Sequence, residues 1–130
     1  MKTEAVTFII SGYQKDLPLE NNQAAHAYLK AELDHHNIGY KTVAGKYKGF
    51  EEQSLVVVGA WTALLLDLAD DVGQECILML DANREAYLLY VDGDEQEHIG
   101  SWVTASKAEA LAEDSWTYCP ALDSYYVVRP

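Results

Sequence analysis

The stretch EQSLVVV, residues Glu52–Val58, is the clearest β-strand pattern in the sequence. Polar and apolar side chains alternate at its start, and the β-branched valines at its end favour extended backbone. Residues 40–47 (YKTVAGKY) alternate more weakly and are joined to this stretch through Lys48, Gly49 and Phe50. Two such runs with a short glycine-containing connection are typical of a hairpin. The sequence therefore predicts two antiparallel strands here.

Upstream of this hairpin, the sequence predicts one strand and one helix. The run AVTFIIS (residues 5–11) is rich in β-branched residues and reads as a largely buried first strand. Asn21 or Asn22 can cap a following helix that extends to about Asn37. His26 falls on the apolar face of this helix, where a buried core histidine is the more common role than a ligand.

Downstream of the hairpin, a second helix and several strands are expected. Apolar side chains from Ala60 to Val72 share one helical face, and Gly73 is a plausible stop. The acidic residues Asp67, Asp70 and Asp71 fall on the opposite face of this helix. The remaining expected elements are strands at Cys76–Leu80, Ala86–Val91, His98–Val103 and Ser124–Val128, and a short helical turn at Lys107–Glu113.

The first 80 residues thus follow the order β-α-β-β-α-β. This order predicts an α+β protein, a ferredoxin-like βαββαβ sandwich with additional C-terminal β-strands, within one domain spanning residues 1–130. Two helices on one face leave the second face of the sheet without cover. The many Tyr and Trp residues indicate that another subunit covers part of it.

The chain is strongly acidic, with 21 Asp and Glu against 9 Lys and Arg and a net charge of -12. Such a charge repels phosphate backbones and anionic membranes, so neither nucleic acid nor a membrane is an expected partner. A cationic small molecule is favoured instead. Two alternatives stay open: the acids serve only solubility, or the protein mimics DNA and occupies a DNA-binding protein.

The sequence lacks the commonest signatures of disulfide, zinc and nucleotide sites. Cys76 and Cys119 stand alone, without CxxC or His-rich spacing, so two packed thiols are expected. No GxGxxG, Walker, HExxH or GxSxG motif occurs. The N-terminal apolar run is too short for a signal peptide, and no apolar stretch approaches the ~20 residues that span a bilayer. A cytoplasmic location follows as the default expectation.

A tyrosine and two adjacent glutamates mark the hairpin as a candidate site. Tyr47 ends its first strand, and Glu51 and Glu52 begin the second. Adjacent residues of a strand point to opposite faces, so at most one of the two glutamates can face a given pocket. By spacing alone, such glutamates are more often solvated turn residues.

Two further groups lie at the ends of other elements. Gln74 follows the second predicted helix, where it could hydrogen-bond an adenine edge or simply close a turn. Ser11, Gly12 and Tyr13 end the first strand, and Asn22 lies at the start of the first helix. Strand ends and helix starts admit ligands, although these residue types are also common in turns.

The order of these groups along the chain resembles one known family. The shared features are Ile9–Tyr13, Glu20–Asn22, His26, Gly45–Lys48, Glu52–Val56, Gln74 with Cys76–Leu78, Trp116–Thr117 and Tyr125–Val128. Together they resemble the bacteriophage S-adenosylmethionine lyases, formerly called S-adenosylmethionine hydrolases, over nearly the whole chain. The segment between Tyr47 and Glu52 is shorter than in that family, so either Glu51 or Glu52 could match the family's essential glutamate.

The resemblance implies a homotrimer of ferredoxin-like subunits with active sites between neighbours, needing neither cofactor nor metal. S-adenosylmethionine would be cleaved to 5'-methylthioadenosine and L-homoserine lactone, counteracting host restriction and methylation. Glu52 and Tyr47 would be catalytic, and Glu51, Gln74 and the Ser11–Tyr13 and Asn22 groups would bind substrate. The alternatives are a hydrolase that gives homoserine and a non-enzymatic acidic anti-restriction protein that mimics DNA.

Overall fold

The computed structural model describes residues 6–59, 61–93 and 95–130. Ala5 and Ala60, at the starts of the first expected strand and the second expected helix, lie outside the described residues. The described residues form three helices, α1 (Leu19–His35), α2 (Thr62–Asp71) and α3 (Lys107–Leu111). The strands are β1 (Thr7–Ile10), β2 (Lys41–Tyr47), β3 (Phe50–Val58), β4 (Cys76–Leu80), β5 (Glu85–Tyr90), β6 (Gln96–Ala105), β7 (Trp116–Cys119) and β8 (Ser124–Arg129).

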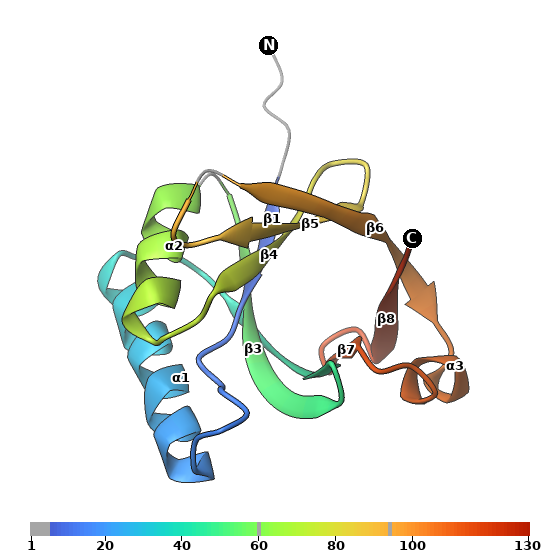
Figure 1. Cartoon of the computed structure of the whole chain (residues 1–130), viewed down its shortest axis with the longest axis horizontal. Coiled ribbons are helices and arrows are strands. Elements are labelled where there is room, and N and C mark those ends of the chain that lie inside the picture. The colour runs from blue at the N-terminus through green and yellow to red at the C-terminus, as the bar shows by residue number, and fades with distance from the viewer. Residues whose placement is uncertain (1–5, 60, 94) are drawn as a thin grey trace.

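The eight strands form a closed barrel in the order β1-β3-β2-β7-β8-β6-β5-β4. Every neighbouring pair is antiparallel. In Figure 1, α1 and α2 lie next to each other on one side of the barrel, and α3 lies on the other side. An eight-stranded barrel has an interior just wide enough to be filled by side chains or to hold one small ligand.

The expected ferredoxin-like sandwich is wrong, because the sheet closes on itself. The order of elements over the first 80 residues is as predicted, but β5, β6 and β8 continue the sheet beyond β4. The unpredicted strand β7 then pairs with both β8 and β2 and completes the ring. The second face of the sheet, which we expected a neighbouring subunit to cover, therefore faces the barrel lumen and is covered by the chain's own strands.

The predicted hairpin is confirmed. β2 and β3 pair from Lys41 opposite Val56 to Tyr47 opposite Phe50, which leaves only Lys48 and Gly49 in the turn. Both turn residues have positive φ, 50° and 83°, as the tight turns that match the twist of paired strands require. This turn places Tyr47 and the start of β3 at the same end of the barrel.

The two long helices cover the outer face of β1, β3 and β4. Phe8, Leu55 and Val57 are fully buried there, against Leu29 of α1 and Leu65 of α2. The hydroxyl of Tyr28 in α1 donates a hydrogen bond of 2.9 Å to Asp71 in α2. This apolar layer is the main core of the protein.

The first helix begins earlier than the sequence predicted. Pro18, with a fixed φ of -59°, precedes the first helical residue, and no side chain caps the helix. Asn22 lies inside the helix instead of at its start, so the predicted asparagine cap is wrong. Asn37 has φ of 58° just beyond the helix end, a left-handed conformation that asparagine tolerates better than most residues.

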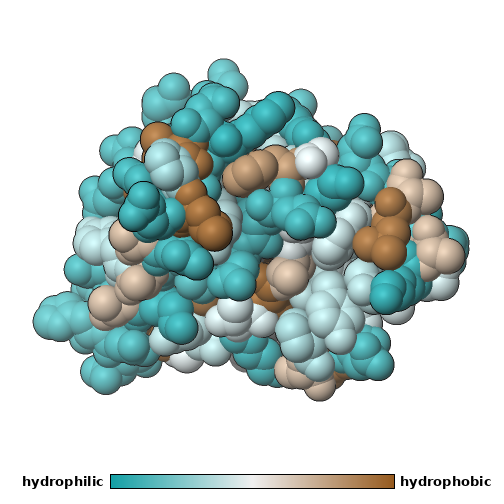
Figure 2. Space-filling model, turned by 90° about the horizontal axis from the view of Figure 1, so that it is seen from below, coloured by the Kyte–Doolittle hydropathy of each residue, from teal (hydrophilic) through white to brown (hydrophobic). Residues whose placement is uncertain are grey.

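The surface seen in Figure 2 is largely hydrophilic, with apolar patches that are small and separated. The three Asp residues of α2 that were predicted to lie outward are all exposed. Among the described residues, no helix is both long and apolar enough to span a membrane.

Candidate functional site

One end of the barrel lumen opens into a pocket of about 350 Å³ that contains four of the predicted site residues. We call it the Glu52 pocket. Its polar lining includes Ser11, Tyr47, Glu52, Ser54 and Gln74. Pockets of about 300 to 1,000 Å³ are typical for small-molecule ligands. The volume is therefore sufficient for a small ligand to be enclosed by the barrel.

The walls of the Glu52 pocket are apolar and aromatic. They include Ile9, Leu78, Leu88, Trp102 and Tyr126. The rings of Trp102 and Tyr126 stack with centroids 5.3 Å apart and planes 16° apart. Aromatic faces carry negative quadrupole charge, so such walls attract cations as well as apolar groups.

Glu52 lies in this pocket, whereas its neighbour Glu51 is exposed and does not line it. The alternation of β3 turns Glu52, Ser54 and Val56 into the lumen. Burial raises the pKa of the Glu52 carboxyl to about 7, and the Ser54 hydroxyl lowers it by a smaller amount. Near neutral pH this carboxyl exchanges a proton readily, and a nearby cation would favour its ionised form.

Tyr47 lies at the mouth of the Glu52 pocket, 39% exposed. Partial burial raises the pKa of its hydroxyl above the ordinary value, so the phenol stays protonated and can donate a hydrogen bond at neutral pH. The ammonium of Lys48 lies 5.3 Å from the centre of the Tyr47 ring. The end of β2 thus supplies the Tyr47 hydroxyl, and the adjacent turn supplies the positive charge of Lys48.

Ser11 and Gln74 line the same pocket and are held by backbone groups. The Ser11 hydroxyl donates to the carbonyl of Gln53 at 2.9 Å and accepts from the amide of Tyr13 at 3.1 Å. Gln74 Nε2 donates to the Tyr13 carbonyl at 2.7 Å. Both side chains are therefore fixed in position before any ligand arrives.

Gly12, Tyr13 and Asn22 do not line the Glu52 pocket; Asn22 lies within α1, and Gly12 and Tyr13 lie against that helix. A Cβ atom on Gly12 would lie 2.8 Å from the Cβ of Ala25, so only glycine allows this close approach. Asn22 is 2% exposed, and its amide exchanges hydrogen bonds with the backbone amide and carbonyl of Gln14 at 2.8 and 3.0 Å. The predicted binding roles of these residues stay predictions.

His26 is a buried core residue, as expected. It is 7% exposed, and its ring lies edge-to-face with Tyr13 at 6.1 Å. Burial, with a smaller effect of Lys30, lowers the pKa of His26. Neither ring nitrogen has a hydrogen-bond partner among the described residues, and the ring does not line the Glu52 pocket.

Cys76 also lines the pocket, which the sequence analysis did not anticipate. Both cysteines are free thiols, as predicted. Partial burial, followed by the charge of Glu75, raises the pKa of Cys76, so the thiol stays neutral. Opposite Cys76, Tyr90 donates a 3.0 Å hydrogen bond to Glu97, which raises the pKa of Tyr90 to about 12.

Within residues 6–59, 61–93 and 95–130, no group of three or more His, Cys, Asp or Glu side chains is placed to hold a metal ion. The polar groups of the Glu52 pocket are one carboxyl with a raised pKa, the protonated phenol of Tyr47, the ammonium of Lys46 and fixed amide and hydroxyl groups. The carboxyl and the aromatic walls suit the cationic groups of a small molecule, and Lys46 suits an anionic group on the same molecule.

Comparison with known proteins identifies the family of the chain. The sequence model of the S-Adenosylmethionine lyase family matches residues 8–129. No curated protein matches the chain. Since the match covers almost every residue, including all those that line the Glu52 pocket, the chain belongs to the S-adenosylmethionine lyase family and is an enzyme with S-adenosylmethionine lyase activity.

Proposed function

We propose that the Glu52 pocket cleaves S-adenosylmethionine to 5'-methylthioadenosine and L-homoserine lactone. The observation that carries this proposal is the carboxyl of Glu52, buried among aromatic and apolar walls at one end of the lumen. An isolated buried carboxylate is costly. A substrate with two positive groups, a sulfonium and an ammonium, offsets that cost.

The substrate contains both its nucleophile and its leaving group. One oxygen of its carboxylate forms a bond to the γ-carbon while the bond from that carbon to sulfur breaks. The electron pair of the broken bond goes to sulfur, which leaves as neutral methylthioadenosine, and no proton is transferred. The protein has to hold a folded conformer, and such orientation supplies up to about 7 to 11 kcal/mol in favourable intramolecular reactions.

Four polar residues of the pocket have a role in this proposal. Glu52 binds the substrate ammonium, and the Tyr47 hydroxyl orients the methionine tail. Ser11 and Gln74 position the rest of the substrate. Their own hydrogen bonds to the backbone of Gln53 and Tyr13 support this role, because fixed side chains lose little freedom on binding.

The predicted binding residues outside the pocket fit an indirect role better than direct contact. Tyr13 acts through its carbonyl, which accepts from Gln74. Gly12 and Asn22 hold the segment after β1 against α1. Glu51 points away from the lumen and adds only negative potential near the mouth.

Hydrolysis to homoserine is the second candidate, because a carboxyl with a pKa of about 7 can also act as a general base on water. Reaction in heavy-oxygen water, with products followed by chromatography and mass spectrometry, separates the two. We expect unlabelled lactone to accumulate before any homoserine. Labelled homoserine without preceding lactone would establish hydrolysis instead.

The cellular role follows from the reaction. Removing S-adenosylmethionine in the cytoplasm of an infected bacterium would deprive methyltransferases and restriction systems of their methyl donor. We propose that no cofactor takes part and that the protein works as a homotrimer with sites between subunits. The exposed Tyr47 at the pocket mouth supports the latter, because a neighbouring chain could close the pocket there.

A further inference from the structure

The opposite end of the barrel lumen opens into a second and larger pocket, of about 880 Å³. We call it the Arg84 pocket. The two pockets share Ile9, Trp102, Thr117 and Tyr126 as lining residues. The stacked rings of Trp102 and Tyr126 therefore belong to a wall that both pockets share. Glu52 lines only the first pocket and Arg84 only the second.

The interior of the Arg84 pocket is apolar. Val43, Val56 and Leu80 line it together with the shared wall. At its rim, Val58 and Leu122 are 58% and 61% exposed, so apolar surface continues outward from the chamber. A ligand with a hydrocarbon or aromatic group would cover this surface and remove it from water, which favours binding.

The charged groups at the rim are mostly basic, in contrast to the protein as a whole. Lys41 and Arg84 line the Arg84 pocket, from β2 and from the turn between β4 and β5. Neither makes an ion pair with a described residue. Asp81 is the only acidic residue among the lining residues of this pocket. A protein with only nine basic residues thus places two of them around one apolar opening.

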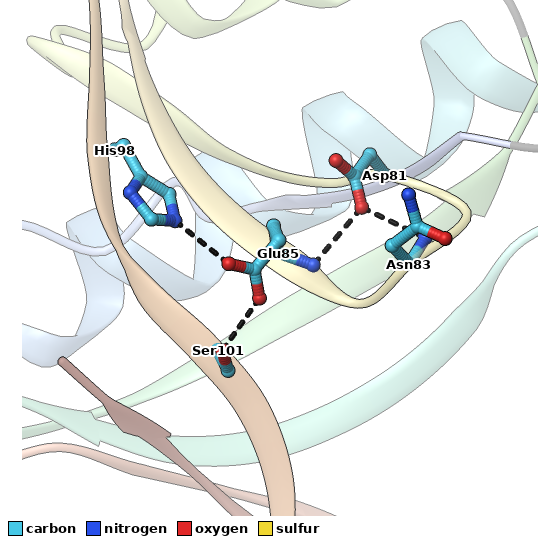
Figure 3. A network of polar contacts seen from close by, with 5 residues as sticks. All are labelled: Asp81, Asn83, Glu85, His98 and Ser101. Atoms are coloured by element: carbon cyan, nitrogen blue, oxygen red, sulfur yellow. Dashed lines mark hydrogen bonds and ion pairs between the residues drawn. The ribbon is translucent and has the colours of Figure 1, made fainter.

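Hydrogen bonds hold the turn between β4 and β5, which contains Arg84, and Figure 3 shows those made by Asp81 and Glu85. Asp81 Oδ1 accepts from the amides of Asn83 and Glu85 at 2.8 and 3.0 Å. The carbonyl of Arg84 accepts from the amide of Trp102 at 2.8 Å. The Asp81 carboxylate is therefore engaged by its own turn, and Arg84 is tied to the strand that carries the shared wall.

The neighbouring polar network does not form a nucleophilic site. His98 Nε2 and the Ser101 hydroxyl both contact the carboxylate of Glu85, at 3.1 and 2.5 Å. The carboxylate lies between the two other groups (Figure 3), so the histidine is not hydrogen-bonded to the serine. This network fixes β5 against β6 beside the turn.

From these features we infer that the Arg84 pocket binds a small amphipathic carboxylate, whose apolar body enters the lumen and whose carboxylate stays at the basic rim. The fork of an arginine guanidinium matches carboxylate geometry, and a long lysine side chain can add a second positive charge. The inference does not depend on the reaction proposed for the Glu52 pocket.

Isothermal titration calorimetry on the intact protein tests this site with three probes. Octanoate carries both the tail and the charge, octanol only the tail and acetate only the charge, all below the concentrations at which they aggregate. We expect octanoate to bind about tenfold or more tightly than either of the others. Equal binding of octanol and octanoate would overturn the proposal, as would no binding of octanoate at millimolar concentration.

Two substitutions locate the site. Lys41→Gln and Arg84→Gln should each weaken octanoate binding by about fivefold to tenfold, and the double variant by more. Lys107→Gln, which removes the same charge from α3 outside both pockets, should change it by less than about twofold. Octanoate affinity that is unchanged in the double variant would place the carboxylate elsewhere and refute the assignment. Circular dichroism of each variant checks that it is folded.

Discussion

The outer face of β1 and β3 packs against the helices, whereas their inner face lines the lumen of the barrel. The outer face of these strands carries Phe8, Leu55 and Val57, all fully buried under α1 and α2. The inner face of β3 carries Glu52, and Ser11, directly after β1, lines the same pocket. Because strand residues alternate between faces, the same short segments of chain supply the core that stabilises the fold and, through other side chains, the polar groups that line the pocket.

This separation explains how the protein tolerates a buried carboxyl. Placing Glu52 in the lumen costs stability, as its raised pKa indicates. The packed layer between sheet and helices lies on the other side of the same backbone and offsets that cost. Substitutions on one face should therefore affect stability, and substitutions on the other should affect catalysis.

Leu55→Ala should have the largest effect on stability. It should weaken the packing between the sheet and the helices and leave the Glu52 pocket unchanged. Truncating a fully buried leucine costs about 2 to 5 kcal/mol of unfolding free energy. Denaturant unfolding measures the change, with Val58→Ala as the control, because Val58 lies on the same strand but is 58% exposed. Activity per folded molecule should stay close to that of the wild type. A loss of less than about 1 kcal/mol would contradict the assigned core.

Glu52→Gln should impair catalysis in the pocket and leave the packing of the outer face unchanged. We expect turnover of S-adenosylmethionine to fall by about 100-fold or more, because the amide cannot neutralise the substrate cation. Steady-state product assays measure the loss. Glu51→Gln is the matched control, since Glu51 is exposed outside the pocket, and it should retain turnover within about threefold. Wild-type turnover in Glu52→Gln would refute the role proposed for this carboxyl.

The same substitution should have a smaller and opposite effect on the stability of the free enzyme. The pKa of Glu52 rises from 4.5 to about 7 on folding, so between these pH values the folded protein keeps a proton that the unfolded chain has released. The wild type therefore loses stability relative to Glu52→Gln as pH rises through this window, by about 1 to 3 kcal/mol. Chemical unfolding at pH 4.5, 6 and 8 measures the difference. A constant difference across these pH values would show that Glu52 titrates normally.

Much of the local structure could be predicted from the sequence. The period-two pattern of residues 52–58 located β3, and the run CILML located β4 with the correct bounds, Cys76–Leu80. The same alternation correctly indicated that Glu51 and Glu52 face opposite sides. Which of the two faces the lumen depends on where the helices pack, and this is a tertiary contact that the pattern does not encode.

Closure of the barrel could not be predicted in the same way. It depends on β7, only four residues long (Trp116–Cys119), which pairs with β2 about 70 positions earlier in the sequence. A short strand shows little alternation of polar and apolar residues. Pairing between distant segments leaves no periodic pattern in the sequence. For the same reason, Trp102 and Tyr126 could not be predicted as pocket walls, since they reach the site only when the ring is closed.

The pH dependence of kcat/KM for S-adenosylmethionine, compared between the wild type and Glu51→Gln, tests the central claim most directly. This quantity reports ionisations of the free enzyme, and Glu52 must be ionised to bind a cation. We predict that kcat/KM in both proteins falls about tenfold per pH unit below a midpoint near the Glu52 pKa of about 7. A kcat/KM that stays constant from pH 7 down to 5.5 would contradict the claim that Glu52 meets the cationic substrate.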